Sequence, residues 1–323
     1  MIKLRAALAV ASVLVLAACG GGQAGSPGSS GGSATGGLTD LKVSVIPIVD
    51  VAPVYLGQQR GFFAEQGLKL ELVQAQGGAA IVPAVVSGQV EFGFSNLTSL
   101  IIARSKGLPL KVVAAGAGST GEQGEDFGGV VVKGDSPMKS AADLPGRRVA
   151  VNTLNNINDT TVRASIRAVG GDPKGVDFVE LAFPDMLAAL DKGNVDAAQV
   201  VEPFLSTALK NGDRLIASNY VDTAPGLTIA GYFTSQQTAA AKPDLVKRFA
   251  AAMQKSLQYA TDNPDAVREV LPTYTKIDQA LIGSLRLPKY PTAIDPASVE
   301  TLTKLALQDG LIQTAPDIKE LLP

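Results

Sequence analysis

The stretch GQVEFGFSNLTSLIIARSKGLPLKVVAA, residues 88–115, decides the fold class. It begins with a predicted strand whose end, Ser95-Asn96, carries side chains that favour the N-cap of a helix. The predicted helix stops at Gly107, and a second predicted strand follows over residues 110–115. A strand, a helix and a strand in this order are typical of a parallel sheet with helices on its faces.

The same alternation continues on both sides of this stretch. Towards the N-terminus we expect strands over 41–48 and 69–74, with helices over 53–61 and 79–87. Residues 116–129 are rich in Gly, Glu and Ser and interrupt the pattern, which then restarts. After the interruption the expected strands are 129–133, 148–152, 176–181, 195–200, 214–217 and 228–234, and the expected helices are 159–169, 186–192, 203–211, 243–261, 264–270 and 296–308.

Part of the pattern recurs 105 residues later, where Gly88-Gln89-Val90-Glu91 corresponds to Gly193-Asn194-Val195-Asp196. A helix, a glycine stop, a strand and a further helix recur in register, which indicates two lobes of the same design. We therefore predict an α/β fold of two lobes, each a mostly parallel sheet flanked by helices, with two hinge crossovers and a cleft between the lobes. The first lobe would comprise 38–127 with 226–323, and the second lobe 128–225.

Residues 1–18 have the features of a secretory signal peptide, which are a short positive start, an apolar run and small residues before the cleavage point. The apolar run is shorter than the roughly 20 residues that span a bilayer. Leu16-Ala17-Ala18-Cys19 resembles the lipobox of bacterial lipoproteins, which implies a diacylglycerol thioether on Cys19. Residues 19–37 are mostly Gly, Ser, Ala and Thr and would form a flexible tether. We expect a protein anchored in the lipid bilayer through Cys19, on the extracytoplasmic face of the cell membrane.

The composition argues against several classes of function. The net charge is −2 and the pI is about 5.4, which does not indicate a nucleic-acid partner. The chain has no histidine, which is the commonest general base and transition-metal ligand, and its one cysteine cannot form a disulfide within the chain. We therefore predict no catalytic residue, no metal and no cofactor, while carboxylate or lysine chemistry stays open.

Open parallel sheets bind ligands beyond the carboxyl ends of their strands, so the loops that follow the predicted strands are the expected site. Each loop leads into a helix, whose free N–H groups and dipole favour anions. None of these loops contains Lys or Arg, so a monoanion or a neutral or zwitterionic heterocycle fits better than a dianion. The residues expected to contact a ligand are Asp50, Val51, Gln76, Gly77, Gly78, Ser95, Asn96, Gly116, Asn152, Thr153, Asn155, Asn156, Asn158, Asp185, Glu202 and Tyr232.

Several of these residues also have a purely structural interpretation. Gly77-Gly78 could permit the close approach of a ligand or form a tight turn, and Ser95-Asn96 would cap a helix in either case. The amide-rich loop 152–158 could be a solvated turn or a polar wall that faces a ligand. The aromatic side chains of Phe183 and Tyr232 could line the cleft or pack in the core.

The acidic residues of the loops have the same two interpretations. Asp50 and Glu202 could satisfy the dipole of a helix, or could accept hydrogen bonds from a ligand. Together with Asp185 they favour a ligand that donates hydrogen bonds.

Three groups of residues carry a family resemblance. They are APVYLG (52–57) with GFFAEQGL (61–68), SP (136–137) with DLPGRRVA (143–150), and GNVDAA (193–198) with EPF (202–204). Over residues 40–270 the chain resembles periplasmic solute-binding proteins for nitrate, taurine and aliphatic sulfonates, a group that also includes binders of hydroxymethylpyrimidine-type thiamine precursors. The resemblance implies a type 2 periplasmic-binding-protein clamshell that acts as a monomer and closes on a small-molecule ligand. It further implies docking on the permease subunits of an ABC importer and their ATPase.

The main hypothesis is therefore a lipid-anchored receptor that delivers a sulfonate, taurine or nitrate type of monoanion to an ABC importer. One alternative is a receptor for a pyrimidine or another heterocyclic or aromatic solute. A second is an extracytoplasmic enzyme that uses the carboxylates of Asp50 and Glu202, and a third is a sensor subunit for a membrane kinase. One relative of the implied fold is a pyrimidine precursor synthase that uses a histidine and a cysteine-rich motif, and this chain has neither.

Overall fold

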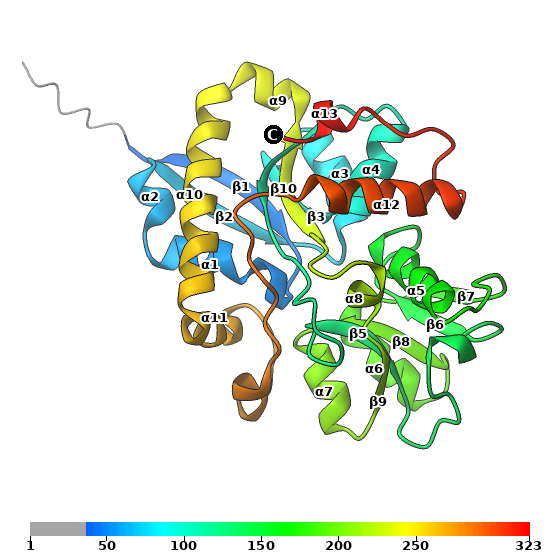
Figure 1. Cartoon of the computed structure of the whole chain (residues 1–323). Coiled ribbons are helices and arrows are strands. Elements are labelled where there is room, and N and C mark those ends of the chain that lie inside the picture. The colour runs from blue at the N-terminus through cyan, green and yellow to red at the C-terminus, as the bar shows by residue number, and fades with distance from the viewer. Residues whose placement is uncertain (1–36) are drawn as a thin grey trace, which may run out of the picture. The chain divides into compact units, whose positions relative to one another are not determined.

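The computed structural model describes residues 37–323. The predicted signal peptide, Cys19 and nearly all of the predicted tether lie outside the described residues. Within residues 37–323 the chain forms two lobes, each built on a five-stranded sheet with helices packed against it (Figure 1). The predicted α/β two-lobe fold class is confirmed. No helix of the described part is long and apolar enough to cross a membrane.

The first sheet has the strand order β2-β1-β3-β10-β4. The strands β2, β1 and β3 are parallel to one another, whereas β10 is antiparallel to both of its neighbours. The bounds are β1 Thr39–Val45, β2 Leu68–Gln74, β3 Phe92–Asn96, β4 Leu110–Ala115 and β10 Ala230–Ser235. The chain thus leaves this lobe after β4 and returns to it with β10.

The second sheet repeats the first, with the order β7-β6-β8-β5-β9. Its one antiparallel strand, β5, is the first strand after the chain has crossed from the other lobe. The bounds are β5 Gly128–Val132, β6 Arg148–Val151, β7 Asp177–Glu180, β8 Ala197–Val201 and β9 Arg214–Ala217. The antiparallel strand in each sheet was not apparent from the strand–helix alternation, because both strands follow the crossover segments instead of a covering helix. The exact limits of the two lobes stay a prediction.

The predicted repeat is visible in the element bounds. The helix α3 (Gly78–Val86) and the helix α6 (Phe183–Asp191) are offset by 105 residues at both ends, as are β3 and β8. The remaining helices before β10 are α1 (Ala52–Gln59), α2 (Phe62–Glu65), α4 (Leu97–Ser105), α5 (Ile157–Ala168), α7 (Phe204–Lys210) and α8 (Asn219–Thr223). A short 3-10 helix, η1 (Val49–Val51), follows β1, and another, η2 (Ala141–Asp143), follows β5.

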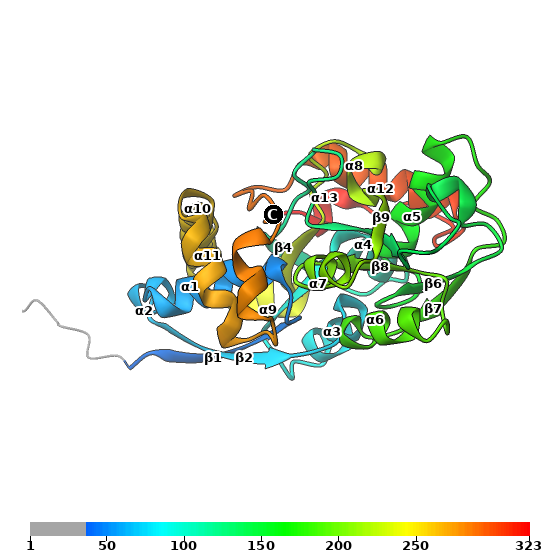
Figure 2. The same ribbon diagram turned by 90° about the horizontal axis from the view of Figure 1, so that it is seen from below.

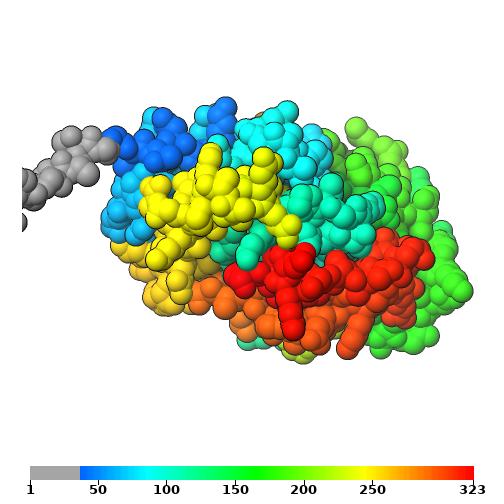
Figure 3. All heavy atoms as spheres, turned by 90° about the horizontal axis from the view of Figure 1, so that it is seen from above, coloured from blue at the N-terminus to red at the C-terminus, as the bar shows by residue number. Residues whose placement is uncertain are grey.

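The C-terminal part of the chain covers the first lobe. Its helices are α9 (Gln236–Ala241), α10 (Pro243–Asp262), α11 (Pro264–Val270), α12 (Pro296–Gln308) and α13 (Ile318–Leu321), with 3-10 turns η3 (Leu271–Thr273) and η4 (Gln279–Ser284). The helix α10 packs on α1 and α2, as Figure 2 also shows. On the opposite side α12 contacts both α4 and α5, and Figure 3 shows the end of the chain, drawn in red, next to residues of the second lobe.

An apolar stripe on α10 forms the centre of this packing. Leu245, Phe249, Met253 and Leu257 are all buried, and the ring of Phe249 stacks on that of Phe92 with 4.0 Å between the centroids. A helix with one apolar face buries it against a sheet because each apolar side chain removed from water contributes about 1.5–3 kcal/mol. The stripe therefore fixes α10 against the sheet of the first lobe.

Candidate functional site

A small cavity lies where residues at the carboxyl ends of strands from both sheets meet. Its volume is about 30 Å³, which is roughly the share of one water molecule in liquid water. The polar residues that line it are Asp50, Asn96, Asn152, Asn156, Asn158 and Tyr220, and the apolar ones are Ile46, Ile48, Phe94, Ile157, Phe183, Val201, Ile229 and Ala230. Larger hollows elsewhere on residues 37–323, such as one of about 630 Å³ beside α10 and the C-terminus, lack this convergence of strand ends.

Asp50 is the one carboxylic acid that lines the cavity. It lies in η1, directly after the first strand, and is 3% exposed. Its Oδ1 atom is buried and has no hydrogen-bond partner among the described residues. Burial raises the pKa of Asp50 to about 7, its own backbone N–H lowers that pKa, and the carboxylate of Asp126 raises it further. Ionisation of this carboxyl group is therefore less favourable in the folded protein than in the unfolded chain.

The other ionisable groups around Asp50 are also acids. Asp126 is buried in the crossover segment, where its carboxylate accepts hydrogen bonds from Ser119 Oγ (2.7 Å) and from the backbone N–H of Thr120 (2.9 Å). Burial, with the charge of Asp50 as a further cause, holds the pKa values of Tyr220 and Tyr232 well above the ordinary value of tyrosine. The interior around Asp50 therefore favours a positive or hydrogen-bond-donating partner over a negative one.

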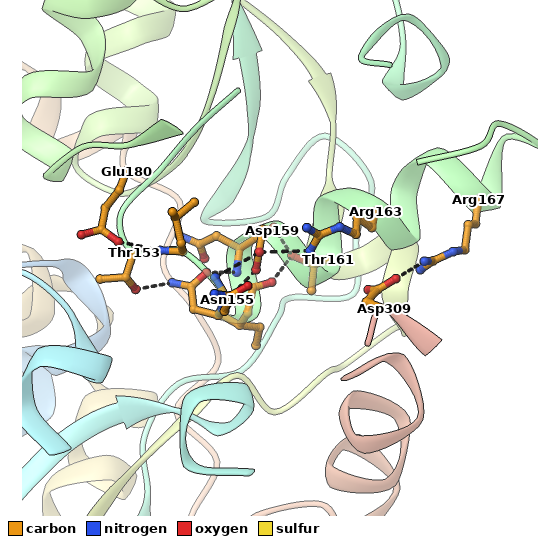
Figure 4. Close-up of polar contacts among 12 residues, drawn as sticks. Thr153, Asn155, Asp159, Thr161, Arg163, Arg167, Glu180 and Asp309 are labelled. Atoms are coloured by element: carbon orange, nitrogen blue, oxygen red, sulfur yellow. Dashed lines mark hydrogen bonds and ion pairs between the residues drawn. The ribbon is translucent and has the colours of Figure 1, made fainter. Parts of the chain in front are cut away.

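The amide-rich loop after β6 forms a polar wall of the cavity. Asn152 Oδ1 accepts hydrogen bonds from Asn156 Nδ2 (2.6 Å) and Asn158 Nδ2 (2.9 Å), and Asn156 is the N-cap of α5. Asp159 completes the cap, since its carboxylate accepts from the backbone N–H groups of Asn155 and Asn156 (Figure 4). The helix begins two residues earlier than predicted because this capping box fixes its start. Asn152, Asn156 and Asn158 are buried, so these amides do not form a solvated turn, and the caps orient the side chains that line the cavity. Contact of this wall with a ligand stays a prediction.

Tyr220 is a cavity residue that the sequence analysis missed. Its hydroxyl donates to Asn158 Oδ1 (3.0 Å) and accepts from Gln199 Nε2 (3.3 Å). It belongs to α8, which directly follows β9. The strand-end rule that selected the other loops applies to this one as well, so the polar run Ser218-Asn219-Tyr220 was the available signal.

Of the two residues expected to contact a ligand at the end of β3, Asn96 lines the cavity and Ser95 packs against α3. Asn96 lines the cavity and caps α4, since its Oδ1 accepts from the backbone N–H of Ser99 (2.8 Å). Ser95 is fully buried beneath Gly78, where a Cβ would lie 2.9 Å from Ser95 Cα. Gly78 therefore permits the close packing of α3 on β3, and its role is structural.

Gly77 lies against the second lobe. A Cβ on Gly77 would lie 2.7 Å from Thr153 Cγ2 and 3.3 Å from Asn152 Nδ2. The φ of Gly77 is −167°, an extended conformation that any residue adopts. The glycine is therefore needed for the close approach of the two lobes and not for a turn.

Glu202 lies beside the cavity but is not among its lining residues. Its carboxylate accepts from Ser206 Oγ (2.7 Å), from the backbone N–H of Ser206 (3.0 Å) and from the backbone N–H of Arg286 (3.1 Å). The side chain is fully buried, and burial raises the pKa of Glu202 against the lowering effect of these bonds. The carboxylate of Glu202 thus accepts from the first turn of α7, whose N-cap is Pro203, and the structure does not bring the carboxylates of Asp50 and Glu202 together in the cavity.

The remaining expected residues do not line the cavity. Four are buried in packing positions and three face solvent. Buried are Val51, Gly116, where a Cβ would lie 2.8 Å from Phe94, Thr153, whose Oγ1 accepts from Asn156 Nδ2 (2.8 Å), and Tyr232, whose hydroxyl has no partner among the described residues; exposed are Gln76, Asn155 and Asp185. Phe183, by contrast, lines the cavity and stacks on Phe204 with 5.7 Å between the ring centroids. Within residues 37–323 no cluster of three His, Cys, Asp or Glu side chains could hold a metal ion.

Two α/β lobes with a polar cavity at their facing strand ends define the fold of the periplasmic binding proteins. Residues 48–267 match the family described as NMT1/THI5 like, and the chain belongs to this family. This confirms the resemblance noted in the sequence.

Relatives in this family include binding proteins and an enzyme. The chain is 27% identical to the taurine-binding periplasmic protein of Escherichia coli K12 over 70% of its own length and 68% of the relative. It is 25% identical to the formylaminopyrimidine-binding protein of Halalkalibacterium halodurans (68% and 65% of the two chains). It is 22% identical to the 4-amino-5-hydroxymethyl-2-methylpyrimidine phosphate synthase of Legionella pneumophila (68% of each chain).

Solved structures share the fold at lower identity. The alkanesulfonate-binding protein of Xanthomonas axonopodis pv. citri bound to MOPS superposes with a TM-score of 0.75 at 16% identity, covering 89% of this chain and all of that one. The periplasmic nitrate-binding protein of Synechocystis PCC 6803 gives a TM-score of 0.73 at 14% identity, with coverage of 88% and 86%. These likenesses establish the two-lobe fold.

The raised pKa of Asp50 predicts how stability depends on pH. The unfolded chain loses this proton near pH 3.8 and the native state near pH 7, so the native state binds more protons between these values and its stability falls as the pH rises through them. One pKa unit corresponds to about 1.4 kcal/mol, so ionisation of Asp50 costs up to about 4 kcal/mol at pH 8. We expect Asp50→Asn to be more stable than the wild type at pH 8 and the difference to shrink towards pH 4, as measured by urea unfolding.

Other buried carboxyl groups contribute equally to both proteins in that comparison, so the difference reports Asp50. An Asp50→Asn protein that is less stable than the wild type at pH 8 would contradict the prediction.

The position of Gly77 predicts a second effect. In Gly77→Ala the new methyl group would meet Thr153 and Asn152 across the lobe boundary, so the closed arrangement is disfavoured by about 1–3 kcal/mol. We expect a larger radius of gyration in small-angle X-ray scattering with little change in melting temperature. Gly283→Ala is the matched control, because a Cβ at Gly283 meets nothing within 4 Å. Equal scattering of both variants would show that Gly77 does not limit closure.

Proposed function

We propose that this protein is the extracytoplasmic substrate-binding component of an ABC importer and captures one small organic solute between its two lobes. The observation that carries the proposal is the cavity at the facing strand ends, where asparagine side chains and Asp50 converge from both lobes. Membership of a family whose relatives include periplasmic binding proteins supports it. The partners would be the permease subunits, with their ATPase, and the protein would act as a monomer.

Binding would proceed by opening and closing of the lobes. A cavity of about 30 Å³ is much smaller than the roughly 300–1,000 Å³ of ordinary ligand pockets, so a solute enters only when the lobes move apart. Two crossover segments join the lobes, which suits a hinge. Ion pairs across the lobes, Arg167 with Asp309 (Figure 4) and Lys210 with Asp278, would form again on closure.

The solute would be a sulfonate, taurine or nitrate type of monoanion or, as the alternative, a pyrimidine or another heterocycle. Apolar side chains such as Ile48, Phe94 and Phe183 suit the carbon skeleton of either kind of organic solute. We propose binding without chemical conversion, because Asp50 is the one carboxylate in the cavity lining and the chain has no histidine.

A thermal-shift screen of the full chain, purified in mild detergent, tests the receptor proposal. The panel holds taurine, alkyl and aryl sulfonates, nitrate, aromatic carboxylates and pyrimidines including thiamine precursors. A solute at 100 times its Kd stabilises the native state by about 2.7 kcal/mol, which raises the melting temperature by several degrees. A shift with one chemical class and recovery of the unchanged solute support a receptor. A converted product would instead identify an enzyme, and no shift at all would oppose a small-molecule site.

We also propose that the mature protein is anchored to the cell membrane by a lipid on Cys19, which supports an extracytoplasmic location. Replacement of Cys19 by Ser removes the thiol that would carry the lipid. We expect wild-type protein in the membrane fraction and Cys19→Ser protein in the soluble extracytoplasmic fraction, as seen by immunoblotting. The same membrane association in both proteins would refute the lipid anchor.

A further inference from the structure

The cavity lining holds one buried acceptor and two donors that have no partner among the described residues. Asp50 is the one charged side chain in the lining, and neither Lys nor Arg is among the lining residues. Asn96 and Asn152 make their hydrogen bonds within the chain through Oδ1, which accepts. Their Nδ2 groups donate to no acceptor within residues 37–323. A solute that satisfies all of these groups needs both a donor and an acceptor.

The acceptor is the more demanding of these groups. Asp50 Oδ1 is buried without a partner, and a buried polar atom in a native protein is normally hydrogen-bonded. The ionisable groups that act on Asp50 or feel its charge are Asp126, Tyr220, Tyr232, Tyr274 and Tyr290, all of them acids. Within residues 37–323 no cation therefore neutralises this carboxylate, which leaves the solute to supply one.

Three hydrogen bonds hold the backbone directly before Asp50 in place. The hydroxyl of Tyr274 donates to the carbonyl of Ile48 (3.1 Å), and that of Tyr290 donates to the carbonyl of Val49 (2.9 Å). The backbone N–H of Val49 donates to the carbonyl of Glu202 in the other lobe (3.1 Å). These bonds fix the backbone on the N-terminal side of Asp50, and the Asp50 side chain is 3% exposed.

We propose that Asp50 is a specificity-determining residue that selects a solute with an amine N–H donor, protonated or neutral. The donor would bind Asp50 Oδ1, and the acceptor end of the same solute would face the amide N–H groups of Asn96 and Asn152. This inference rests on the proposed receptor function and narrows its solute class. An aminoalkyl sulfonate and an amino-substituted pyrimidine both meet the requirement, whereas nitrate and a simple alkyl sulfonate do not.

A bare anion would have no favourable contact with ionised Asp50. Since the pKa of Asp50 is about 7, the ionised form predominates at pH 8, where an anion would meet a carboxylate in an interior of low dielectric and like charges repel strongly. An amine reverses the sign of this interaction, and a site built to bind an N–H group discriminates strongly against the analogue that lacks it. The presence of the amine, and not the acidic end of the solute, should thus decide affinity.

Matched pairs of probes test the inference by isothermal titration calorimetry on the full chain in mild detergent. Taurine is paired with ethanesulfonate and 4-aminopyrimidine with pyrimidine, so that each pair differs by one amine. For at least one pair we expect the amine to improve affinity tenfold or more. In Asp50→Asn this preference should fall below about threefold, because the carboxylate that accepts the N–H bonds is gone. The two pairs also distinguish a sulfonate from a heterocycle as the source of the amine.

Two controls separate loss of recognition from loss of the fold. Asp135→Asn makes the same substitution in an exposed turn and should leave the amine preference intact. The melting temperature of Asp50→Asn without solute should be unchanged or raised at pH 8, since the substitution removes a buried unpaired carboxylate. An amine-free solute that binds as tightly as its partner, or a preference that survives in Asp50→Asn, overturns the inference.

The outcome also separates this inference from the receptor proposal. Tight binding of nitrate or an alkyl sulfonate alone would refute the role of Asp50 and leave the receptor function in place. Failure of every solute, in these pairs and in the wider panel, would refute both.

Discussion

The two lobes are joined through Glu202, and the geometry of the cavity depends on this junction. The carbonyl of Glu202 accepts from Val49 in the first lobe, and its carboxylate accepts from Arg286 and Ser206. A buried carboxylate is tolerated only when such bonds replace its hydration. Because Asp50 follows Val49 directly, the bond between Val49 and Glu202 also fixes Asp50 against the second lobe. The buried carboxylate of Glu202 thus has three hydrogen-bond donors, whereas the buried Oδ1 atom of Asp50, across the cleft, has no partner among the described residues.

The internal repeat explains why the cavity lies where it does. Each sheet presents its parallel strands in the same direction, and the antiparallel strands β5 and β10 occupy equivalent places beside β8 and β3. Two sheets of the same design that face each other bring the ends of β3 and β8 into one lining, together with the loops after β1 and β6. One apolar cluster runs through both lobes and the C-terminal helices, and a second, smaller cluster around Val130, Val149 and Ile166 lies within the second lobe.

Local patterns predicted most of the fold, and contacts distant in sequence account for what was missed. Four elements were predicted with the limits that the structure shows, since turn signals and apolar periodicity are local. They are residues 110–115, 214–217, 264–270 and 296–308. The short helix α8 has too few residues to show a period, so Tyr220 was missed although its loop follows a strand. Glu202 could not be assigned from sequence, because a capping carboxylate and a ligand-binding one look alike until Arg286, 84 residues away, is placed beside it.

The pattern of satisfied and unsatisfied polar groups separates structural from functional roles in this site. Asn156, Asp159 and Glu202 have their hydrogen bonds within the chain, which stabilises the loops that they cap. Asp50 has an unused buried acceptor, and Asn96 and Asn152, in the same cavity lining, have Nδ2 donors without a partner among the described residues. Replacement of an unsatisfied buried group by an apolar or neutral side chain is often stabilising. An acid that weakens the unliganded protein and lies at the lobe boundary is therefore best explained by a partner that arrives with the solute, which also gives closure of the lobes a chemical driving force.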